Sequence, residues 1–368
     1  MIDSKPYIGR GAQLTEMEQR ERSIDSADLT DPKFYVAPPA LADAVKVARA
    51  LDMPLLLTGE PGCGKSQLAH SVAWELGLEE PLTFTVKSDS QGRDLFYSYD
   101  TLGRFREKND DDPYRFLRLN ALGRAIWGVL GEDAVKQEDV ELESCIKKDK
   151  QLRFDLPGAV VLIDEIDKAP REVPNDILNE IEALSFDIPE LPTCPQFALK
   201  KFKHNSKDAT ESAQQRNVSK PIIIITSNRE RELPEAFLRR CVYYHVNLPP
   251  FRKDKQSDRS VTIEDIIKRR LGIDIAASAD SPNSEKNIWA GGVSLFAYLR
   301  NARLQKAPST AELLSWLLWL RQRYGLDWQK QVKDIEDFLP SAKITLFKHM
   351  EDQSRADDLF NKWCASKS

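Results

Sequence analysis

Hydrophobic residues in the first 250 positions gather in short unbroken runs. Five such runs are MPLLLT at 53–58, PLTFTV at 81–86, GAVVLIDEID at 158–167, PIIIITSN at 221–228 and YYHVNLP at 243–249. Short runs in which apolar residues predominate are typical of strands buried in a parallel sheet. The pattern therefore predicts strands at these five places.

Helical patterns lie between these predicted strands. They cover 38–52, which opens with prolines suited to a first helical turn, and 65–77, 115–131 and 170–184. Strands that alternate with helices within one segment predict an α/β fold with a parallel sheet. Two stretches interrupt the alternation: a charged one at 132–153 and a polar one at 187–219, interpreted as a flexible insert.

The strand signals stop after about residue 250. The segments 261–272, 294–305, 309–325 and 341–363 all have helical patterns, and Ser309 with Glu312 forms a capping-box sequence. We therefore predict an α/β domain over 35–250 and a smaller all-helical domain over 251–368. The polar residues 1–34 are interpreted as a mobile tail, with a strap docked on a neighbour as the alternative.

Composition narrows the class of protein. The 368 residues are 41% hydrophobic, and 53 Lys and Arg against 58 Asp and Glu give a net charge of −5. This balance argues against bulk capture of nucleic acid or an anionic membrane. The N-terminus has no apolar signal segment, no apolar run is long enough to span a bilayer, and the five cysteines show no paired spacing. We expect a soluble cytoplasmic protein.

Residues 59–66 read GEPGCGKS, which fits the phosphate-loop pattern GxxxxGK[ST] between a predicted strand and a predicted helix. Glycines let the backbone turn its amide groups around an anion, and the helix N-terminus adds partial positive charge. Lys65 is expected to reach the β- and γ-phosphates of ATP, and the Ser66 hydroxyl to ligate Mg²⁺. Cys63 is expected to be a small filler. The predicted nucleotide-binding residues are Gly59, Glu60, Pro61, Gly62, Cys63, Gly64, Lys65, Ser66 and Gln67.

Two acids follow the apolar run at 158–163. We expect Asp164 to hold Mg²⁺ through water and Glu165 to take a proton from the attacking water. Asp167 and Lys168 are interpreted as solvated or paired surface groups. Asn228 ends another buried run, where its amide would orient the water beside Glu165; the alternative is an asparagine that helps the chain to turn.

Four motifs occur in a fixed order: GEPGCGKS, VLIDEIDKAP, ITSN and LPEAFLRRC. Together they resemble the motifs of AAA+ ATPases. The sequence at 163–182 and 233–249 is most similar to that of the MoxR branch. The resemblance covers about 35–325. It implies an αβα P-loop sandwich followed by a helical lid, assembled as a ring, usually of six subunits. It also implies a remodelling ATPase whose partner bears a von Willebrand A domain.

The same resemblance assigns a role to two adjacent arginines. It implies that Arg240 reaches the γ-phosphate bound by the neighbouring subunit, with Arg239 as a second contact or an interface ion pair. Both follow Asn228 and an LPEA segment, so we expect them at the edge of the domain, where a guanidinium needs an anion. The alternative is that both arginines only hold the subunit surface.

The chain departs from the family pattern in the lid. Thr310 and Ala311 stand where a sensor arginine should fall, so that Arg303 or Lys306 substitutes for it or lid coupling is weak. In the segment 88–100, Phe96, Tyr97 and Tyr99 are candidates to line a ring pore and grip a client; the alternative is that they pack locally.

Three classes of function follow. The first is a ring-forming, Mg²⁺-dependent ATPase that remodels a protein client. The second is a nucleic-acid loader or motor, which the net charge disfavours, and the third is a regulatory nucleotide-binding scaffold. The basic clusters at 268–270 and 300–306 are interpreted as solvated helix faces. The polar stretch near 193–219 is interpreted as a loop, with partner binding as the alternative.

Overall fold

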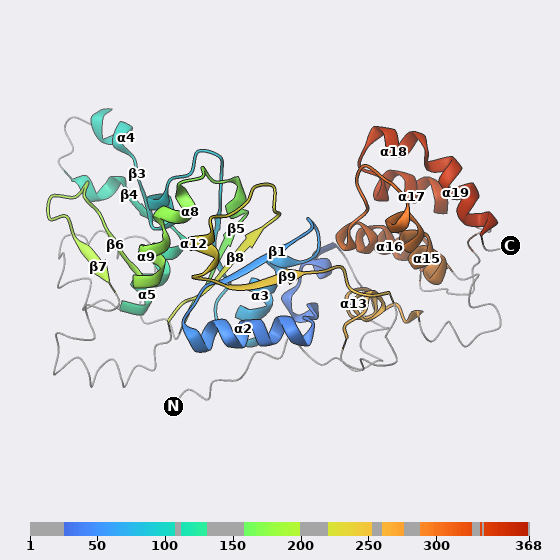
Figure 1. Ribbon diagram of the computed structural model, residues 1–368, viewed down its shortest axis with the longest axis horizontal. Coiled ribbons are helices and arrows are strands. Elements are labelled where there is room, and N and C mark those ends of the chain that lie inside the picture. Colours follow the sequence, from blue (N-terminus) through green and yellow to red (C-terminus); the bar gives the residue numbers. More distant parts are fainter. Residues whose placement is uncertain are drawn as a thin grey trace. The chain divides into compact units, whose positions relative to one another are not determined.

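A computed structural model of the chain describes residues 26–106, 112–130, 158–198, 220–251, 260–275, 288–325, 332 and 335–366 (Figure 1). These residues form two compact units. The first contains 43–59 and the described part of 72–245. The second contains 26–42, 60–71 and the described part of 246–366.

The first unit is built on a five-stranded sheet (Figure 1). Its spatial order is β2 (Leu82–Thr85), β5 (Val160–Asp164), β8 (Ile222–Ser227), β1 (Leu55–Gly59) and β9 (Val242–Val246). β5 pairs in parallel with both β2 and β8, and β8 pairs in parallel with β1. These are the five predicted strands. The predicted α/β fold with a parallel sheet is therefore confirmed, and the buried side chains of the inner strands explain their unbroken apolar runs.

The helices of the first unit differ in part from the sequence pattern. The structure has α2 (Pro39–Leu51), α3 (Lys65–Glu75), α5 (Ala121–Leu130) and α12 (Glu235–Leu238). The helix expected over 170–184 is two short ones, α8 (Val173–Asp176) and α9 (Leu178–Ala183). The prediction of a helix over 115–131 is wrong for residues 115–120. That part forms the end of a 3-10 turn, η4 (Pro113–Phe116), and the strand β4 (Leu117–Leu119).

Two small antiparallel sheets of two strands each add to this unit. β3 (Tyr97–Tyr99) lies between the 3-10 turn η3 (Gly92–Leu95) and α4 (Thr101–Arg106), and it pairs with β4. β6 (Ser185–Asp187) pairs with β7 (Gln196–Ala198). The flexible-insert interpretation is therefore wrong for 187–198, because Phe197 of β7 is buried between the rings of Trp127 and Phe186. The rest of that insert, 199–219, and the charged stretch 132–153 lie outside the described residues.

The described elements after Val246 are all helical, as the sequence predicts. They are α13 (Ile263–Leu271), α15 (Ile288–Asn301), α16 (Thr310–Tyr324), α17 (Phe338–Leu346), α18 (Met350–Ser354) and α19 (Ala356–Ala365). The ring of Trp316 packs 5.0 Å from that of Phe338, and its indole N–H donates to Ser341. The predicted capping box of Ser309 and Glu312 is present. Within the described ranges, no helix is long and apolar enough to cross a bilayer.

The helical unit also includes two 3-10 turns near the N-terminus, η1 (Ser26–Leu29) and η2 (Pro32–Phe34). Arg270 of α13 is buried and donates to the carbonyl oxygens of Asp28 and Asp31, at 3.1 and 2.6 Å. These carbonyls satisfy a guanidinium that is costly to bury alone. Residues 28–31 are thus attached to α13, whereas residues 1–25 of the predicted tail lie outside the described residues. The basic cluster 268–270 is not a fully solvated face, because Arg270 is buried.

Candidate active site

The predicted phosphate loop joins β1 to the N-terminus of the 11-residue helix α3. Gly62 and Gly64 have φ angles of +77° and +92°, a backbone conformation that other residues rarely adopt. Lys65, the first residue of α3, is buried, and its ammonium donates to the Glu60 carbonyl oxygen at 3.0 Å. A glycine-rich loop with a cation at a helix N-terminus fits a phosphate group.

The other loop residues have separate surroundings. Cys63 is half-buried, and burial raises the pKa of its thiol against the opposing influence of Lys65. The thiol is therefore protonated at neutral pH, which suits its expected role as a filler. The side-chain oxygen of Gln67 accepts a hydrogen bond from Arg270 at 3.3 Å, so Gln67 is directed toward α13. Pro61 is exposed and Ser66 is half-buried.

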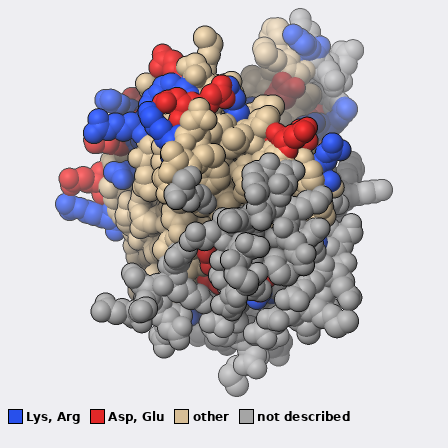
Figure 2. All heavy atoms as spheres, turned by 90° about the vertical axis from the view of Figure 1, so that its right-hand side faces the viewer, with Lys and Arg blue, Asp and Glu red and all other residues tan. Residues whose placement is uncertain are grey.

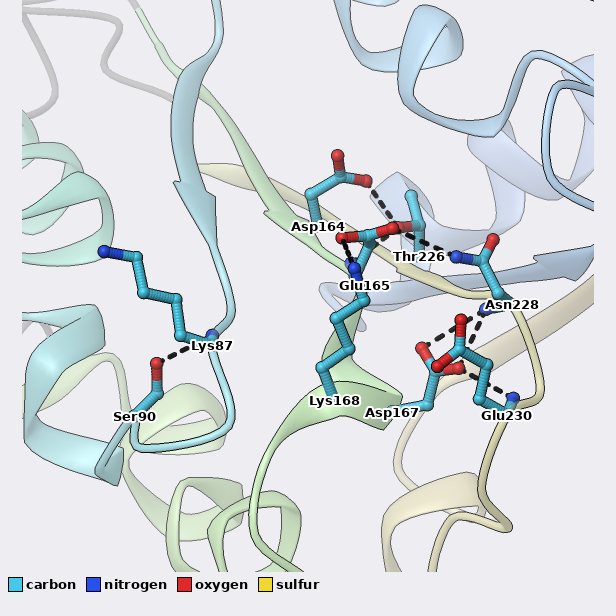
Figure 3. A network of polar contacts seen from close by, with 9 residues as sticks. All are labelled: Lys87, Ser90, Asp164, Glu165, Asp167, Lys168, Thr226, Asn228 and Glu230. Atoms are coloured by element: carbon cyan, nitrogen blue, oxygen red, sulfur yellow. Dashed lines mark hydrogen bonds and ion pairs between the residues drawn. The ribbon is translucent and has the colours of Figure 1, made fainter.

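Asp164 is the last residue of β5 and Glu165 follows it, and a threonine of β8 joins both residues to β8 (Figure 3). The Thr226 hydroxyl donates to Asp164 Oδ1 at 2.6 Å and accepts the Glu165 N–H at 2.9 Å. Glu165 has a left-handed backbone, φ 62° and ψ 49°. The turn that follows β5 therefore begins at Glu165, while Asp164 stays in register with the sheet. The sequence analysis missed Thr226, which reads as one more residue of an apolar strand.

Both carboxylate oxygens of Glu165 have partners (Figure 3). Asn228 Nδ2 donates to Oε1 at 3.1 Å, and Lys168 Nζ donates to Oε2 at 2.6 Å. The hydrogen bond to Glu165 raises the pKa of Lys168, which keeps the ammonium charged. The structure thus brings Glu165 and Asn228 together at the carboxyl ends of two adjacent parallel strands. Lys168 is a paired group, one of the two alternatives that the sequence left open.

Asp167 contradicts its sequence interpretation as a surface group. It is only 2% exposed. Its carboxylate accepts the backbone N–H of Asn228 at 3.2 Å and that of Glu230 at 2.9 Å. A buried carboxylate is stable when such donors satisfy it. Asp167 therefore fixes the loop that carries Asn228, although it is not one of the predicted site residues.

The two adjacent arginines lie just after α12 and are exposed. Arg239 pairs with Glu235 at 3.3 Å. Arg240 pairs with Glu182 of α9, also at 3.3 Å, and donates to the Ala236 carbonyl. These contacts are with α9 and α12, and not with the acids after β5. Their expected role on a neighbouring subunit stays a prediction.

The lid residues near the phosphate loop are not the ones that the sequence suggested. Arg303 is exposed, and only its backbone carbonyl has a described partner, Arg355; the backbone N–H of Lys306 donates to Asp352. Within the described residues, neither side chain has a hydrogen bond or ion pair with the phosphate loop. Arg300 of α15 does contact the loop, through the Glu60 carboxylate, at 2.8 Å. The sequence signal for it was present, since Arg300 opens the basic cluster 300–306.

The candidate pore aromatics are part of the core. Phe96 and Tyr97 are buried, with their rings 5.4 and 6.3 Å from that of Phe186. The Tyr97 hydroxyl donates to Glu190 at 2.8 Å, and burial together with this bond raises the pKa of Tyr97. Tyr99 is half-buried and its hydroxyl accepts from Arg104 at 3.0 Å. The pore interpretation is wrong for Phe96 and Tyr97, and the packing alternative is correct.

The fold and the site together define a P-loop ATPase. A family model described as "AAA domain (dynein-related subfamily)" matches residues 54–241, just over half of the 368 residues. The chain therefore belongs to this AAA domain family, and it is an AAA+ ATPase that binds ATP. The matched range begins just before β1 and ends at Cys241, so it contains the phosphate loop, both acids, Asn228 and the adjacent arginines.

Solved structures to which the chain shows a distant similarity include RuvB of Thermotoga maritima. One is described as a Holliday junction branch migration motor and another is a variant of the same protein. Each is 14% identical to this chain, covers 89% of it and has 72% of its own length covered, with TM-scores of 0.36 and 0.37 respectively. Likeness at this level is no guide to function. A comparison with curated proteins found no significant match.

Proposed function

We propose that this chain is a ring-forming, Mg²⁺-dependent ATPase that uses hydrolysis to remodel a protein client. Residues 59–67 bind the nucleotide, Glu165 is the general base, and Asn228 orients the attacking water. The observation that carries the catalytic part is the arrangement of Glu165. Its carboxylate is held at the end of β5 by Asn228 from the neighbouring strand and by Lys168.

The donor groups suit this chemistry. Ser66 and Asp164 are the residues that would hold Mg²⁺, and hydroxyl and carboxylate oxygens are ligands that this ion prefers. No group of three or more His, Cys, Asp or Glu side chains in the described ranges is placed to hold a metal. When bound, Mg²⁺ neutralises developing charge on the phosphoryl oxygens.

Glu165 has to accept a proton, and its surroundings keep it able to do so. Lys168 holds a positive charge 2.6 Å from Oε2, which favours the ionised carboxylate. Asn228 donates to the other oxygen from a loop that Asp167 fixes. The base therefore begins in its charged form and in one orientation. Lys168 must yield Oε2, or share it, when Glu165 receives the proton from water.

The charge pattern favours a protein client over a nucleic acid. Each of the two basic clusters, 268–270 and 300–306, has an arginine with an internal contact: Arg270 with the Asp31 carbonyl and Arg300 with the Glu60 carboxylate. On the face seen in Figure 2, described Lys and Arg side chains lie among Asp and Glu side chains. Pairs of this kind in the C-terminal helices are Lys343 with Asp357 and Lys362 with Asp358. Partnership with a von Willebrand A domain protein rests on the MoxR resemblance alone.

The catalytic proposal is tested by Glu165→Gln. The amide fits the same place but cannot accept a proton, so ATP binding by calorimetry should persist while hydrolysis falls about 10²–10⁴-fold. Lys65→Ala should abolish ATP binding, because it removes the cation at the loop. Glu172→Gln, an exposed glutamate at the start of α8, is the matched control. Hydrolysis by Glu165→Gln close to the parent rate would remove Glu165 from this role.

The client is tested with the same trapped variant. With ATP bound and hydrolysis blocked, Glu165→Gln should retain a protein client that the parent releases. A nucleic-acid motor would instead show ATPase stimulation by DNA that weakens steeply with salt. A regulatory scaffold would show no hydrolysis by the parent protein. The three classes of function are therefore separated by one set of assays.

A further inference from the structure

Arg300 holds the phosphate loop through a two-pronged contact. It lies in the last turn of α15, and its Nη1 and Nη2 donate to Glu60 Oε2 and Oε1 at 2.8 and 3.3 Å. Nη1 also donates to the Pro308 carbonyl at 3.2 Å. The Arg300 side chain is only 15% exposed. A planar guanidinium that binds both oxygens of a carboxylate fixes the orientation of the carboxylate as well as its distance.

Glu60 is at the same time a partner of the phosphate-binding lysine. Its carbonyl oxygen accepts the Lys65 ammonium at 3.0 Å, while its carboxylate accepts Arg300. One residue of the loop therefore joins Lys65, on one side, to the lid helix α15, on the other. In the proposed ATP complex, the phosphates attract Lys65, so its bond to the Glu60 carbonyl weakens or breaks.

The start of α16 lies against the same loop. The Ala311 N–H donates to the Gly62 carbonyl at 3.2 Å. A Cβ atom on Gly62 would lie 2.6 Å from the Ser309 hydroxyl oxygen, closer than such atoms approach in proteins. Ser309 is itself fixed by its capping box with Glu312. Residues 60–62 are thus held at two points, by the end of α15 and by the beginning of α16.

We propose that Arg300 is a positioning residue for the nucleotide: it fixes the phosphate loop through Glu60 and links the loop to helices α15 and α16. This inference rests on the proposed ATP-binding function of residues 59–67. It assigns the coupling between the bound nucleotide and the helical lid to the contact of Arg300 with Glu60. Arg300 acts on Glu60 and does not need to touch a phosphate. The ion pair replaces the sensor arginine that is missing at Thr310 and Ala311.

A double-mutant cycle tests the proposal. Glu60→Gln and Arg300→Gln should each weaken ATP binding about fivefold, a coupling of ordinary size between linked sites. The double variant should be about as weak as either single one, because both changes break the same pair. Arg303→Gln, three residues further along and exposed, is the matched control and should bind ATP as the parent does. Isothermal titration calorimetry measures all five proteins.

The outcomes separate this inference from the proposed function. If the parent does not bind ATP, the proposed function fails. If the parent binds but Arg300→Gln binds equally well, only the inference fails. If Arg300→Gln weakens binding by the same factor in the Glu60→Gln background, Arg300 acts on the nucleotide directly and the proposal is overturned.

A second measurement keeps a folding defect apart from lost coupling. Hydrogen exchange should show ATP-dependent protection of amides in α15 and α16 of the parent, and Arg300→Gln should lose that protection at saturating ATP. Without nucleotide, both proteins should melt alike, because one partner of the pair is largely exposed and such pairs stabilise little. Equal ATP-dependent protection in the two proteins would contradict the coupling role.

Discussion

Asp167 organises the catalytic end of the sheet without being part of the predicted machinery. Its buried carboxylate accepts backbone N–H groups of Asn228 and Glu230, so the loop after β8 is attached to the turn after β5. Asn228 in turn donates to Glu165. The position of the water-orienting amide therefore depends on a carboxylate two residues beyond the proposed base. Backbone N–H donors to a charged acceptor are among the stronger hydrogen bonds.

Asp167→Asn should therefore lower both stability and turnover. The amide keeps one acceptor, but its NH₂ faces backbone donors, so the free energy of unfolding should fall by about 1.5–3 kcal/mol. Urea unfolding measures this fall, and steady-state ATPase assays should show a lower kcat with little change in ATP affinity. Asp176→Asn, an exposed aspartate on α8, is the control and should match the parent. Unchanged stability of Asp167→Asn would mean that the loop is held by other contacts.

The sequence predicted the proposed catalytic residues better than the residues that hold them in position. Glu165 and Asn228 were found because a polar residue that ends an apolar run has no packing role. Thr226 and Asp167 were missed because their function depends on β5 lying beside β8, with Ile163 opposite Ile225. Local pattern does not say which strands are neighbours. A hydroxyl inside an apolar run and an acid in a turn both look ordinary until that pairing is known.

At the scale of elements, the secondary-structure prediction is wrong where short segments pack against the core. The stretch 115–131 has enough apolar residues for a helix, yet 117–119 pairs with Tyr97–Tyr99 as a strand. Asn120 ends that strand, because its N–H donates to the Phe96 carbonyl and its side chain to that of Asp94. The capping box before α16, by contrast, was predictable because its signal is local. Tertiary pairing overrides propensity most easily in three-residue strands.

Phe96→Ala tests the assignment of the aromatic segment to the core. Removing this buried ring should lower the free energy of unfolding by about 3–5 kcal/mol, as expected for a fully packed phenylalanine. Phe105→Ala on α4 makes the same chemical change at a ring that is 74% exposed, and its effect should stay within about 0.5 kcal/mol. Chemical denaturation compares the two. A stable Phe96→Ala that loses only client-stimulated activity would restore the pore interpretation.

On the scale of the whole molecule, each unit has its own hydrophobic core. One core surrounds the sheet and includes Trp127 and Phe237; the other joins the C-terminal helices and includes Trp289 and Trp316. The sequence pattern predicted a change from an α/β domain to a helical domain near residue 250. In the structure, the last segment of the second unit begins at Val246. The pattern did not reveal that residues 60–71, directly after β1, group with the helices. That grouping depends on contacts between positions about 240 residues apart, such as Glu60 with Arg300.

The last prediction concerns assembly and the role of Arg240. Its ion pair with Glu182 joins two exposed side chains at 3.3 Å, and such surface pairs contribute at most about 1 kcal/mol, so Arg240 exchanges partners at little cost. If it acts on the nucleotide of a neighbouring subunit, Arg240→Ala should bind ATP normally and lose hydrolysis, by about 10³–10⁵-fold. Arg171→Ala, another exposed arginine of the first unit, should keep parental activity.

Mixing decides whether the arginine acts across subunits. Arg240→Ala and Lys65→Ala are each expected to be inactive alone, but co-assembled rings contain interfaces with an intact Lys65 from one subunit and an intact Arg240 from the next. Those composite sites should hydrolyse ATP, so the activity of the mixture should rise above that of either variant at the same total concentration. Activity should also fall when the parent is diluted below its assembly concentration. Failure of the two variants to complement in co-assembled rings, or full activity of a dilute monomer, would confine Arg240 to the surface ion pairs of its own chain.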